Sequence, residues 1–279
     1  MANVVPLDPN ALAQEIAAAY ASGRTISIPP SARDAVFDLA AAYAVEAELA
    51  RRRRASGRTT VGRKVGFANK ALWRILKIDT LVWAHMYDDT VQYADTNAAT
   101  LPVGRMCSPK IEPEIVFKMK KPLDSGSPLE PAAVLDAVEW LALGFEIIDC
   151  VYADWKFQPA DFVAAFGLHA ALVVGEPRRI DPATIPTLAD ELPRFKIRLS
   201  RDGRLIEEGS GRNSLRSPAL CLGELASGIA RQPGAEPLAA GELVSSGTLT
   251  ESRPIAPGET WTAVVDGLDL PELSLRTKP

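Results

Sequence analysis

The sequence is poor in cysteine and histidine. Its 279 residues include three cysteines, Cys107, Cys150 and Cys221, and two histidines, His85 and His169. The cysteines are far apart and form no CxxC pair, which argues against a disulfide framework and favours buried thiols in a reducing compartment. Two histidines this widely separated in the sequence do not suggest a zinc cluster.

Other signals are missing as well. No apolar run approaches the roughly 18 residues of a membrane helix, and the N-terminus lacks the basic start and apolar core of a signal peptide. There is no G-x-S-x-G of an α/β serine hydrolase, and "GSGRNS" at 209–214 lacks the ending of a phosphate loop. A net charge of −4 argues against nucleic acid as a partner, and most of the basic run at 51–64 is interpreted as a solvated helix end. We therefore expect a soluble, cytoplasmic protein with no nucleic-acid or membrane partner.

The predicted elements change character near residue 58. Helices are predicted over 8–23 and 31–57, the second with Ser31 as a candidate cap. Later helices are predicted over 131–149 and 217–232. Six strand-like stretches are predicted, with a hairpin turn at 201–204: 59–67, 110–119, 169–177, 195–209, 241–249 and 259–268. Strands in series with a few helices predict the α+β class.

The stretch "KIEPEIVFKM", 110–119, carries two carboxylates at strand spacing. Because side chains of a strand repeat every two residues, Glu112 and Glu114 point to the same face. This pattern fits a solvated strand face, and it also fits part of an oxygen-ligand site for a hard cation such as Mg²⁺. Pro113 between them lacks a backbone donor and predicts an edge strand or a bulge.

Two further stretches hold charged residues in apolar company. In "LGFEIIDCVYADWKF", 143–157, Glu146, Asp149 and Asp154 need partners, which a metal ion or a salt bridge to Lys156 would provide. In "GRKVGF", 62–67, Lys64 is either a strand lysine facing water or a lysine in semi-apolar surroundings that moves protons.

The turn "VSSGTLT", 244–250, places small hydroxyl residues around a glycine. Such a turn can donate hydrogen bonds to a carboxylate or phosphate, and it can equally be a plain connection.

Taken in order, the motifs resemble a known family. "GRKVGFANKA", "MYDDTV", "KIEPEIVFKM", "FEIIDCVYADWKF", "GELVSSGTLT" and "PGETWTAVVDGL" together resemble the fumarylacetoacetate hydrolase superfamily, in its branch of 2-keto-4-pentenoate hydratases and 4-oxalocrotonate decarboxylases. The resemblance covers most of the chain from about residue 60. It implies a mixed, rolled β-sheet in a catalytic domain over 58–279, with an N-terminal helical segment over 1–57 packed on it as one compact unit.

The resemblance also implies roles for particular residues. Glu112, Glu114 and Glu146 match the family's Mg²⁺ or Mn²⁺ ligands, with Asp149 as a competitor for the third place. Lys64 matches the lysine implied in proton transfer, and Lys156 matches a second lysine near the pocket. Candidates for substrate binding are Ser246, Thr248, His169 and Asp89.

The implied activity is a metal-dependent hydratase, a hydro-lyase that adds water to a 2-hydroxy-2,4-dienoate, as in aromatic meta-cleavage catabolism. The alternatives are a decarboxylase of a 4-oxalocrotonate-type acid, an acylpyruvate C–C hydrolase with His85 as its histidine, and a non-catalytic partner subunit. "DFVAAFGLHAALVVG" at 161–175 and the bulky "LVWAHMYDD" at 81–89 depart from the branch and suggest a larger or differently substituted substrate. A homo-oligomer is expected, with association with a related decarboxylase as a further expectation.

Overall fold

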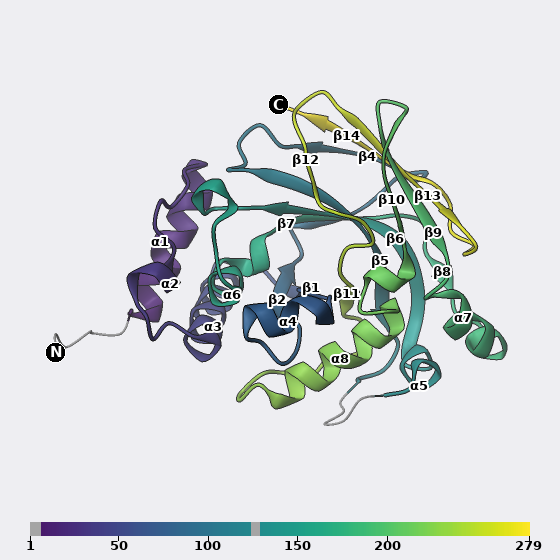
Figure 1. The fold of residues 1–279 in the computed structure, drawn as a ribbon, viewed down its shortest axis with the longest axis horizontal. Coiled ribbons are helices and arrows are strands. Elements are labelled where there is room, and N and C mark those ends of the chain that lie inside the picture. Colours follow the sequence, from purple (N-terminus) through teal and green to yellow (C-terminus); the bar gives the residue numbers. More distant parts are fainter. Residues whose placement is uncertain (1–6, 124–128) are drawn as a thin grey trace.

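The computed structural model describes residues 7–123 and 129–279. Figure 1 shows the N-terminal helices gathered at one side of the molecule, next to curled β-sheets, with further helices along the lower edge of the view. The helices are α1 (Pro9–Ser22), α2 (Pro30–Arg33), α3 (Leu39–Ala55), α4 (Lys70–Leu76), α5 (Pro131–Leu135), α6 (Pro159–Ala164), α7 (Ile185–Glu191) and α8 (Pro218–Arg231). Short 3₁₀ turns are η1 (Ala153–Trp155), η2 (Phe166–Leu168), η3 (Pro182–Thr184) and η4 (Gly211–Asn213).

The larger sheet has nine strands. Its main path runs in the order β2 (Val82–Tyr87), β1 (Thr60–Gly66), β11 (Leu243–Ser245), β5 (Pro109–Met119), β6 (Val138–Asp149), β7 (His169–Val174) and β3 (Val91–Tyr93). Two short strands pair beside this path: β12 (Arg253–Pro254) on β5 and β8 (Arg178–Arg179) on β6. The pairs β1–β11 and β3–β7 are parallel and the other pairs are antiparallel.

The smaller sheet has five strands in the order β10 (Arg204–Ser210), β9 (Lys196–Arg201), β13 (Thr260–Asp266), β14 (Leu273–Lys278) and β4 (Ala98–Pro102). The predicted hairpin at 201–204 joins β9 to β10. The mixed, curled sheets confirm the predicted α+β fold of the rolled-sheet type.

The helix predicted over 131–149 is wrong for most of its length. Only Pro131–Leu135 is helical, and Val138–Asp149 is the strand β6. This strand lies between β5 and β7 and is buried on both faces, so its side chains form a continuous apolar run without the alternation of a half-buried strand. A buried strand and a buried helix cannot be distinguished from such a run by periodicity.

The single helix predicted over 31–57 is interrupted. The chain is extended at Asp34, and α3 begins at Leu39, where the Asp38 side chain accepts a hydrogen bond from the Ala41 N–H. Ser31 therefore does not cap the long helix. Its hydroxyl instead donates to Asp161 of α6, at 2.5 Å.

The expectation that Pro113 marks an edge strand is also wrong, because β5 pairs with β6 along nearly its whole length and with β11 and β12 on its other side. The Pro113 carbonyl accepts from the Leu249 N–H at 2.9 Å. The N and C=O of one strand residue point to the same side, so the missing donor faces the gap between β11 and β12, where no ladder bond is lost.

The two larger hydrophobic clusters among the described residues hold most of the elements in place. One lies between the sheets and the helices α5, α7 and α8, and includes Phe117, Phe145 and Trp261. The other joins Leu12 and Leu49 of the N-terminal helices to residues of α6 and of the chain after β6. In the described part of the chain, no helix is long and apolar enough to cross a membrane.

Candidate active site

Three glutamates converge where β5 lies against β6. Glu112 and Glu146 are direct partners in the antiparallel register, and Glu114 follows on the same face of β5 opposite Gly144. One carboxylate oxygen from each of the three lies within 4.8 Å of the others. The period of the strand brings the first two together, and the β5–β6 pairing adds the third.

Hydrogen bonds fix two of these carboxylates and leave one oxygen of each without a partner. Glu114 Oε2 accepts from the Ser245 hydroxyl at 2.6 Å and from the Gly247 N–H at 2.8 Å. Glu146 Oε1 lies 3.0 Å from His169 Nδ1. Glu114 Oε1 and Glu146 Oε2 are buried and have no hydrogen-bond partner.

Unpaired carboxylate oxygens are costly to bury, and these two belong to the same converging set. An all-oxygen donor set of this kind suits a hard divalent cation. The residues therefore fit a Mg²⁺-type ion, which would satisfy both oxygens and offset the three negative charges.

The site electrostatics reflect a shortage of positive charge. Burial and repulsion from Glu146 raise the pKa of Glu112 to about 7, although the Lys64 ammonium opposes the shift. Burial and the two neighbouring glutamates raise the pKa of Glu114 well above its ordinary value. Burial acts in the same direction on Glu146, but Lys64 and His169 together outweigh it and lower the pKa of that carboxyl.

Lys64 is the cation nearest to the carboxylates and is 1% exposed. From β1 its Nζ donates to the Gly167 carbonyl at 3.0 Å and lies 3.2 Å from Glu146 Oε1. The ammonium also lies 4.8 Å from the centroid of the Phe162 ring. Lys64 is thus held between a charged partner and an aromatic ring. Of the two alternatives that the sequence left open, the one in which Lys64 faces water is therefore wrong.

Gly167 explains part of the unusual stretch at 161–175. Its φ is +60°, and a Cβ there would lie 2.7 Å from Lys64 Cδ. A side chain at this position would therefore push on the lysine, so the glycine leaves room for Lys64 to reach Glu146.

A cavity of about 590 Å³ opens beside these groups. Apolar and aromatic side chains line it together with polar residues from η4 and from the segment after β11. Its lining includes Lys64, Phe67, Leu72, Lys110, Glu112, Ile148, Trp155, Phe157, Phe162, Leu168, Asn213, Thr248, Thr250, Glu251 and Ser252.

The "SSGTL" turn contributes to the site, partly through residues that were not singled out from the sequence. Thr248 lines the cavity, whereas the Ser246 hydroxyl is buried and donates to the Ile115 carbonyl at 2.8 Å. The contacts to Glu114 come from Ser245 and the Gly247 N–H. The pairing of β11 with β5 sets which of the two serines faces the glutamate, and that pairing is not visible in the motif.

Two other candidates lie away from the cavity. Lys156 pairs with Asp154 at 3.1 Å, its side chain is 79% exposed, and it is not among the lining residues. Asp89 pairs with Arg53 and, at 3.1 Å, with Arg58 near the end of α3. Neither side chain is brought to the carboxylate cluster.

His169 lies behind the cluster and does not line the main cavity. Its Nδ1 contacts Glu146, and its Nε2 is 2.9 Å from Thr90 Oγ1. The ring therefore holds the Glu146 carboxylate in its orientation without itself lining the cavity. Asp149 is not part of the group of converging acids: its oxygens accept from the Cys107 and Ser108 N–H groups at 2.9 and 2.6 Å.

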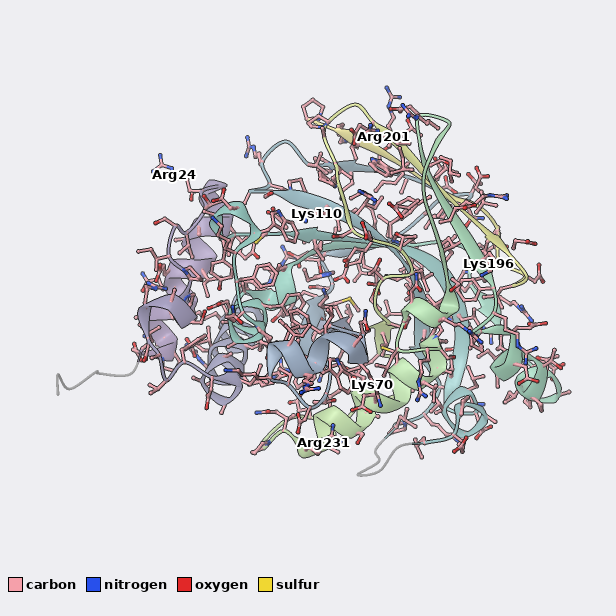
Figure 2. All side chains as sticks on the ribbon, in the orientation of Figure 1. Arg24, Lys70, Lys110, Lys196, Arg201 and Arg231 are labelled. Atoms are coloured by element: carbon pink, nitrogen blue, oxygen red, sulfur yellow. The ribbon has the colours of Figure 1, made fainter. Side chains whose placement is uncertain are left out.

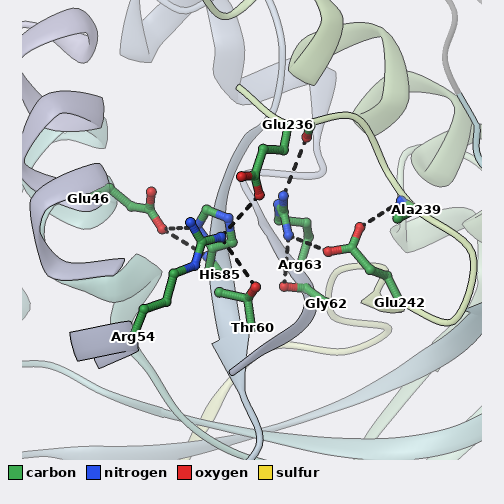
Figure 3. A network of polar contacts seen from close by, with 9 residues as sticks. All are labelled: Glu46, Arg54, Thr60, Gly62, Arg63, His85, Glu236, Ala239 and Glu242. Atoms are coloured by element: carbon green, nitrogen blue, oxygen red, sulfur yellow. Dashed lines mark hydrogen bonds and ion pairs between the residues drawn. The ribbon is translucent and has the colours of Figure 1, made fainter. Parts of the chain in front are cut away.

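His85 forms a pair with an acid on the opposite face of the sheet. Its Nδ1 lies 2.6 Å from Glu46 Oε1, within a polar network that includes Arg54 and Arg63 (Figure 3). In the β1–β2 register His85 is the partner of Arg63, whereas Lys64 is the partner of Ala84. Neighbouring residues of a strand face opposite sides, so His85 points away from Lys64 and the carboxylates.

The rolled mixed sheet, with converging glutamates and a buried lysine beside a cavity, defines an enzyme of the fumarylacetoacetate hydrolase fold. A solved fumarylpyruvate hydrolase from Pseudomonas aeruginosa, in complex with Mn²⁺ and pyruvate, shares the fold at 19% identity, with a TM-score of 0.56 over 78% of this chain and 89% of that chain. A 4-oxalocrotonate decarboxylase from Pseudomonas putida G7, complexed with magnesium and adipate, gives a TM-score of 0.85 at 25% identity over 96% and 97% of the two chains. No protein-family model matches the chain.

Curated relatives narrow the class. A 2-hydroxyhexa-2,4-dienoate hydratase of Comamonas testosteroni is 30% identical over 91% of this chain and 92% of its own length. A 2-keto-4-pentenoate hydratase of Paraburkholderia xenovorans (strain LB400) is 30% identical over 92% and 90%. The chain therefore belongs to the hydratase and decarboxylase branch of the fumarylacetoacetate hydrolase superfamily.

Proposed function

We propose that this protein is a divalent-metal-dependent hydratase, which adds water to a 2-hydroxy-2,4-dienoate and forms a 4-hydroxy-2-oxo acid. The observation that carries the proposal is the convergence of Glu112, Glu114 and Glu146, with unpartnered buried oxygens, next to the buried ammonium of Lys64. The hydratase names of several relatives at about 30% identity support the same reaction.

The donor set favours Mg²⁺ or Mn²⁺, held by the three glutamates. When bound, such an ion supplies Lewis-acid stabilisation of the negative charge that develops on the substrate's C2 oxygen. Ser245 and the Gly247 N–H keep the Glu114 carboxylate in position, and His169 does the same for Glu146.

Lys64 is the proton carrier in this proposal. The 2-hydroxyl loses its proton and C5 gains one, which converts the dienol into an α,β-unsaturated ketone. Water then adds its oxygen to C4, and C3 takes up the remaining proton. Lys64 moves one of these protons from its place between Gly167 and Glu146, and an ordered water or an acid of the cluster moves the other.

Decarboxylation of a 4-oxalocrotonate-type acid is the second candidate. The TM-score of 0.85 to a 4-oxalocrotonate decarboxylase favours it. The same stabilisation of negative charge on the substrate's C2 oxygen would accommodate the electrons left behind by the departing CO₂. Acylpyruvate hydrolysis is less favoured because His85, the histidine considered for water activation, faces away from the glutamates.

We infer further that the substrate arises from the breakdown of aromatic compounds, since the dienoate is the enol acid expected from ring cleavage. The expected homo-oligomer and the association with a related decarboxylase remain predictions. Light scattering of the purified chain, alone and with such a decarboxylase, measures both.

The test is metal-dependent loss of the ultraviolet absorbance of 2-hydroxypenta-2,4-dienoate, followed with Mg²⁺ and with EDTA. We expect turnover by the wild type to a 4-hydroxy-2-oxo acid, without release of CO₂. EDTA and Glu114→Gln should abolish turnover, whereas Glu272→Gln, which changes an exposed carboxyl outside the cluster, should leave it intact. Metal-independent turnover would refute the proposal, and CO₂ release from a 4-oxalocrotonate without hydration of the dienoate would favour the decarboxylase.

A further inference from the structure

A row of aromatic side chains runs along the cavity away from the catalytic lysine. The ring centroids of Phe67 and Phe162 are 5.1 Å apart, those of Phe162 and Phe157 are 6.2 Å apart, and those of Phe157 and Trp155 are 6.2 Å apart. All four residues line the cavity. We call these four side chains the aromatic row.

Two lysines contact rings of the aromatic row. The Lys64 ammonium lies 4.8 Å from the centroid of Phe162, and the Lys110 ammonium lies 3.6 Å from the centroid of Trp155. Lys110 is on β5, two residues before Glu112 and on the same face, well inside the outline of the molecule (Figure 2). The row therefore leads from the reacting groups to the part of the cavity beyond the metal ligands.

The cavity is larger than a five-carbon acid needs. Its volume of about 590 Å³ is in the range of pockets that enclose drug-sized ligands. Ile148, Leu168 and Leu72 extend the apolar wall beside the rings. Three rings of the row, those of Phe67, Trp155 and Phe157, are only partly buried, so the chain itself does not cover this wall.

The backbone at Trp155 is held in an uncommon conformation that keeps the indole at the wall. Asp154 and Trp155 have φ values of +58° and +57°, a region that costs non-glycine residues about 1 kcal/mol or more. The indole N–H donates to the Ser108 hydroxyl at 2.7 Å. Strain of this kind next to a cavity is a common feature of ligand-binding positions.

On the basis of the proposed function, we propose that the substrate is a 2-hydroxy-2,4-dienoate with an apolar alkyl or aryl substituent on its distal carbon. The substituent lies along the aromatic row, and Trp155, Phe157 and Leu72 determine specificity for it. The oxygens of the substrate stay at the glutamate end, and the reacting carbons lie beside Lys64.

A substrate with a second carboxylate is the competing possibility, because Lys110 could bind it. The Lys110 ammonium already lies on the Trp155 ring, however, and Glu112 is a negative neighbour on the same strand face. The extent of the apolar wall around these groups favours an uncharged substituent.

The test measures binding of saturated 2-oxo acids to the Mg²⁺-loaded protein by calorimetry. These acids cannot be hydrated, so the result does not depend on turnover. Burial of one methylene strengthens binding by about fourfold, so we expect 2-oxooctanoate to bind at least about tenfold more tightly than 2-oxopentanoate, and 2-oxo-6-phenylhexanoate to bind at least as tightly as 2-oxooctanoate. Equal affinities, or tighter binding of 2-oxoadipate than of 2-oxooctanoate, would overturn the proposal.

Variants locate the effect. Trp155→Ala and Leu72→Ala should reduce the preference for 2-oxooctanoate to about threefold or less. Ile75→Ala is the matched control, because Ile75 is on the same helix as Leu72, is 75% exposed and does not line the cavity. If the preference for 2-oxooctanoate survives in both Trp155→Ala and Leu72→Ala, the substituent does not bind along this apolar wall.

Turnover of 2-hydroxypenta-2,4-dienoate, measured in parallel, separates this inference from the proposed function. Turnover without a preference for longer acids would overturn the inference alone. A preference for longer acids without turnover of any dienoate would overturn the hydratase reaction and retain the apolar subsite. No binding of any 2-oxo acid would overturn both.

Discussion

Replacing Lys64 with methionine tests the site most directly, because it removes one charge and keeps the length of the side chain. The ammonium is 1% exposed and lies 3.2 Å from Glu146, which is itself fully buried. In Lys64→Met the Glu146 carboxylate keeps only His169 as a side-chain partner.

The expected magnitude follows from this geometry. Removing one partner of a buried ion pair costs about 3–5 kcal/mol. His169 still contacts the same oxygen, so we expect the free energy of unfolding of the metal-free variant to fall by about 3 kcal/mol. For a chain of this size, that loss lowers Tm by roughly 6 °C. A bound Mg²⁺ would compensate the Glu146 charge, so the deficit should be smaller when metal is present. Loss of the proton carrier should lower kcat by about 10²–10⁴-fold.

The assay combines thermal melts in EDTA and in Mg²⁺ with the rate of dienoate loss. Lys70→Met is the control, because Lys70 is an exposed lysine at the start of α4 that does not line the cavity (Figure 2). A rate within about threefold of the wild type would refute the role of Lys64 in proton transfer. A Tm deficit of the same size with and without Mg²⁺ would refute the charge compensation on which the metal site depends.

Three further predictions concern residues of η2, β1 and β5. Gly167→Ala places a Cβ 2.7 Å from Lys64 Cδ at a φ of +60°, so kcat should fall by at least about tenfold while metal binding measured by calorimetry stays within about threefold; an unchanged kcat would contradict this. Gly62→Ala places a Cβ 2.0 Å from the Leu243 carbonyl and forces β1 away from β11, so the free energy of unfolding should fall by about 1–3 kcal/mol in denaturant titrations, and an unchanged midpoint would contradict it. The folded-state pKa of Glu112, about 7, lies above its ordinary value of 4.5, so its contribution to the stability of the metal-free protein is present at low pH and is lost as the pH rises through 7. Mg²⁺ competes with that proton, so its affinity should be about tenfold weaker at pH 6 than at pH 8 and it should raise Tm more at pH 8; an affinity that does not change with pH would count against this explanation.

The sequence by itself determined much of the local structure. Asp8 and Gly23 cap the two ends of α1, and the turn at 201–204 produces the β9–β10 hairpin. α8 follows its predicted range closely, although the Ser217 side chain makes no cap hydrogen bond. The two-residue period of a strand puts Glu112 and Glu114 on one face of β5. The ordered motifs also indicated the superfamily, because they record residues that a common site requires and not only the local preferences of the backbone.

Other features were decided only by tertiary structure. The run at 138–149 is a strand because it pairs with β5 along one edge and with β7 along the other. This placement puts Glu146 opposite Glu112, while Asp149 accepts from the N–H groups of Cys107 and Ser108. The pairing of β11 with β5 selects Ser245 as the partner of Glu114. The exposed position of Lys156 and the pairing of Asp89 with Arg53 and Arg58 depend on contacts across the chain. Sequence spacing fixes which side chains share a face, but which faces meet, and how much space remains between them, depends on long-range packing that no local pattern encodes.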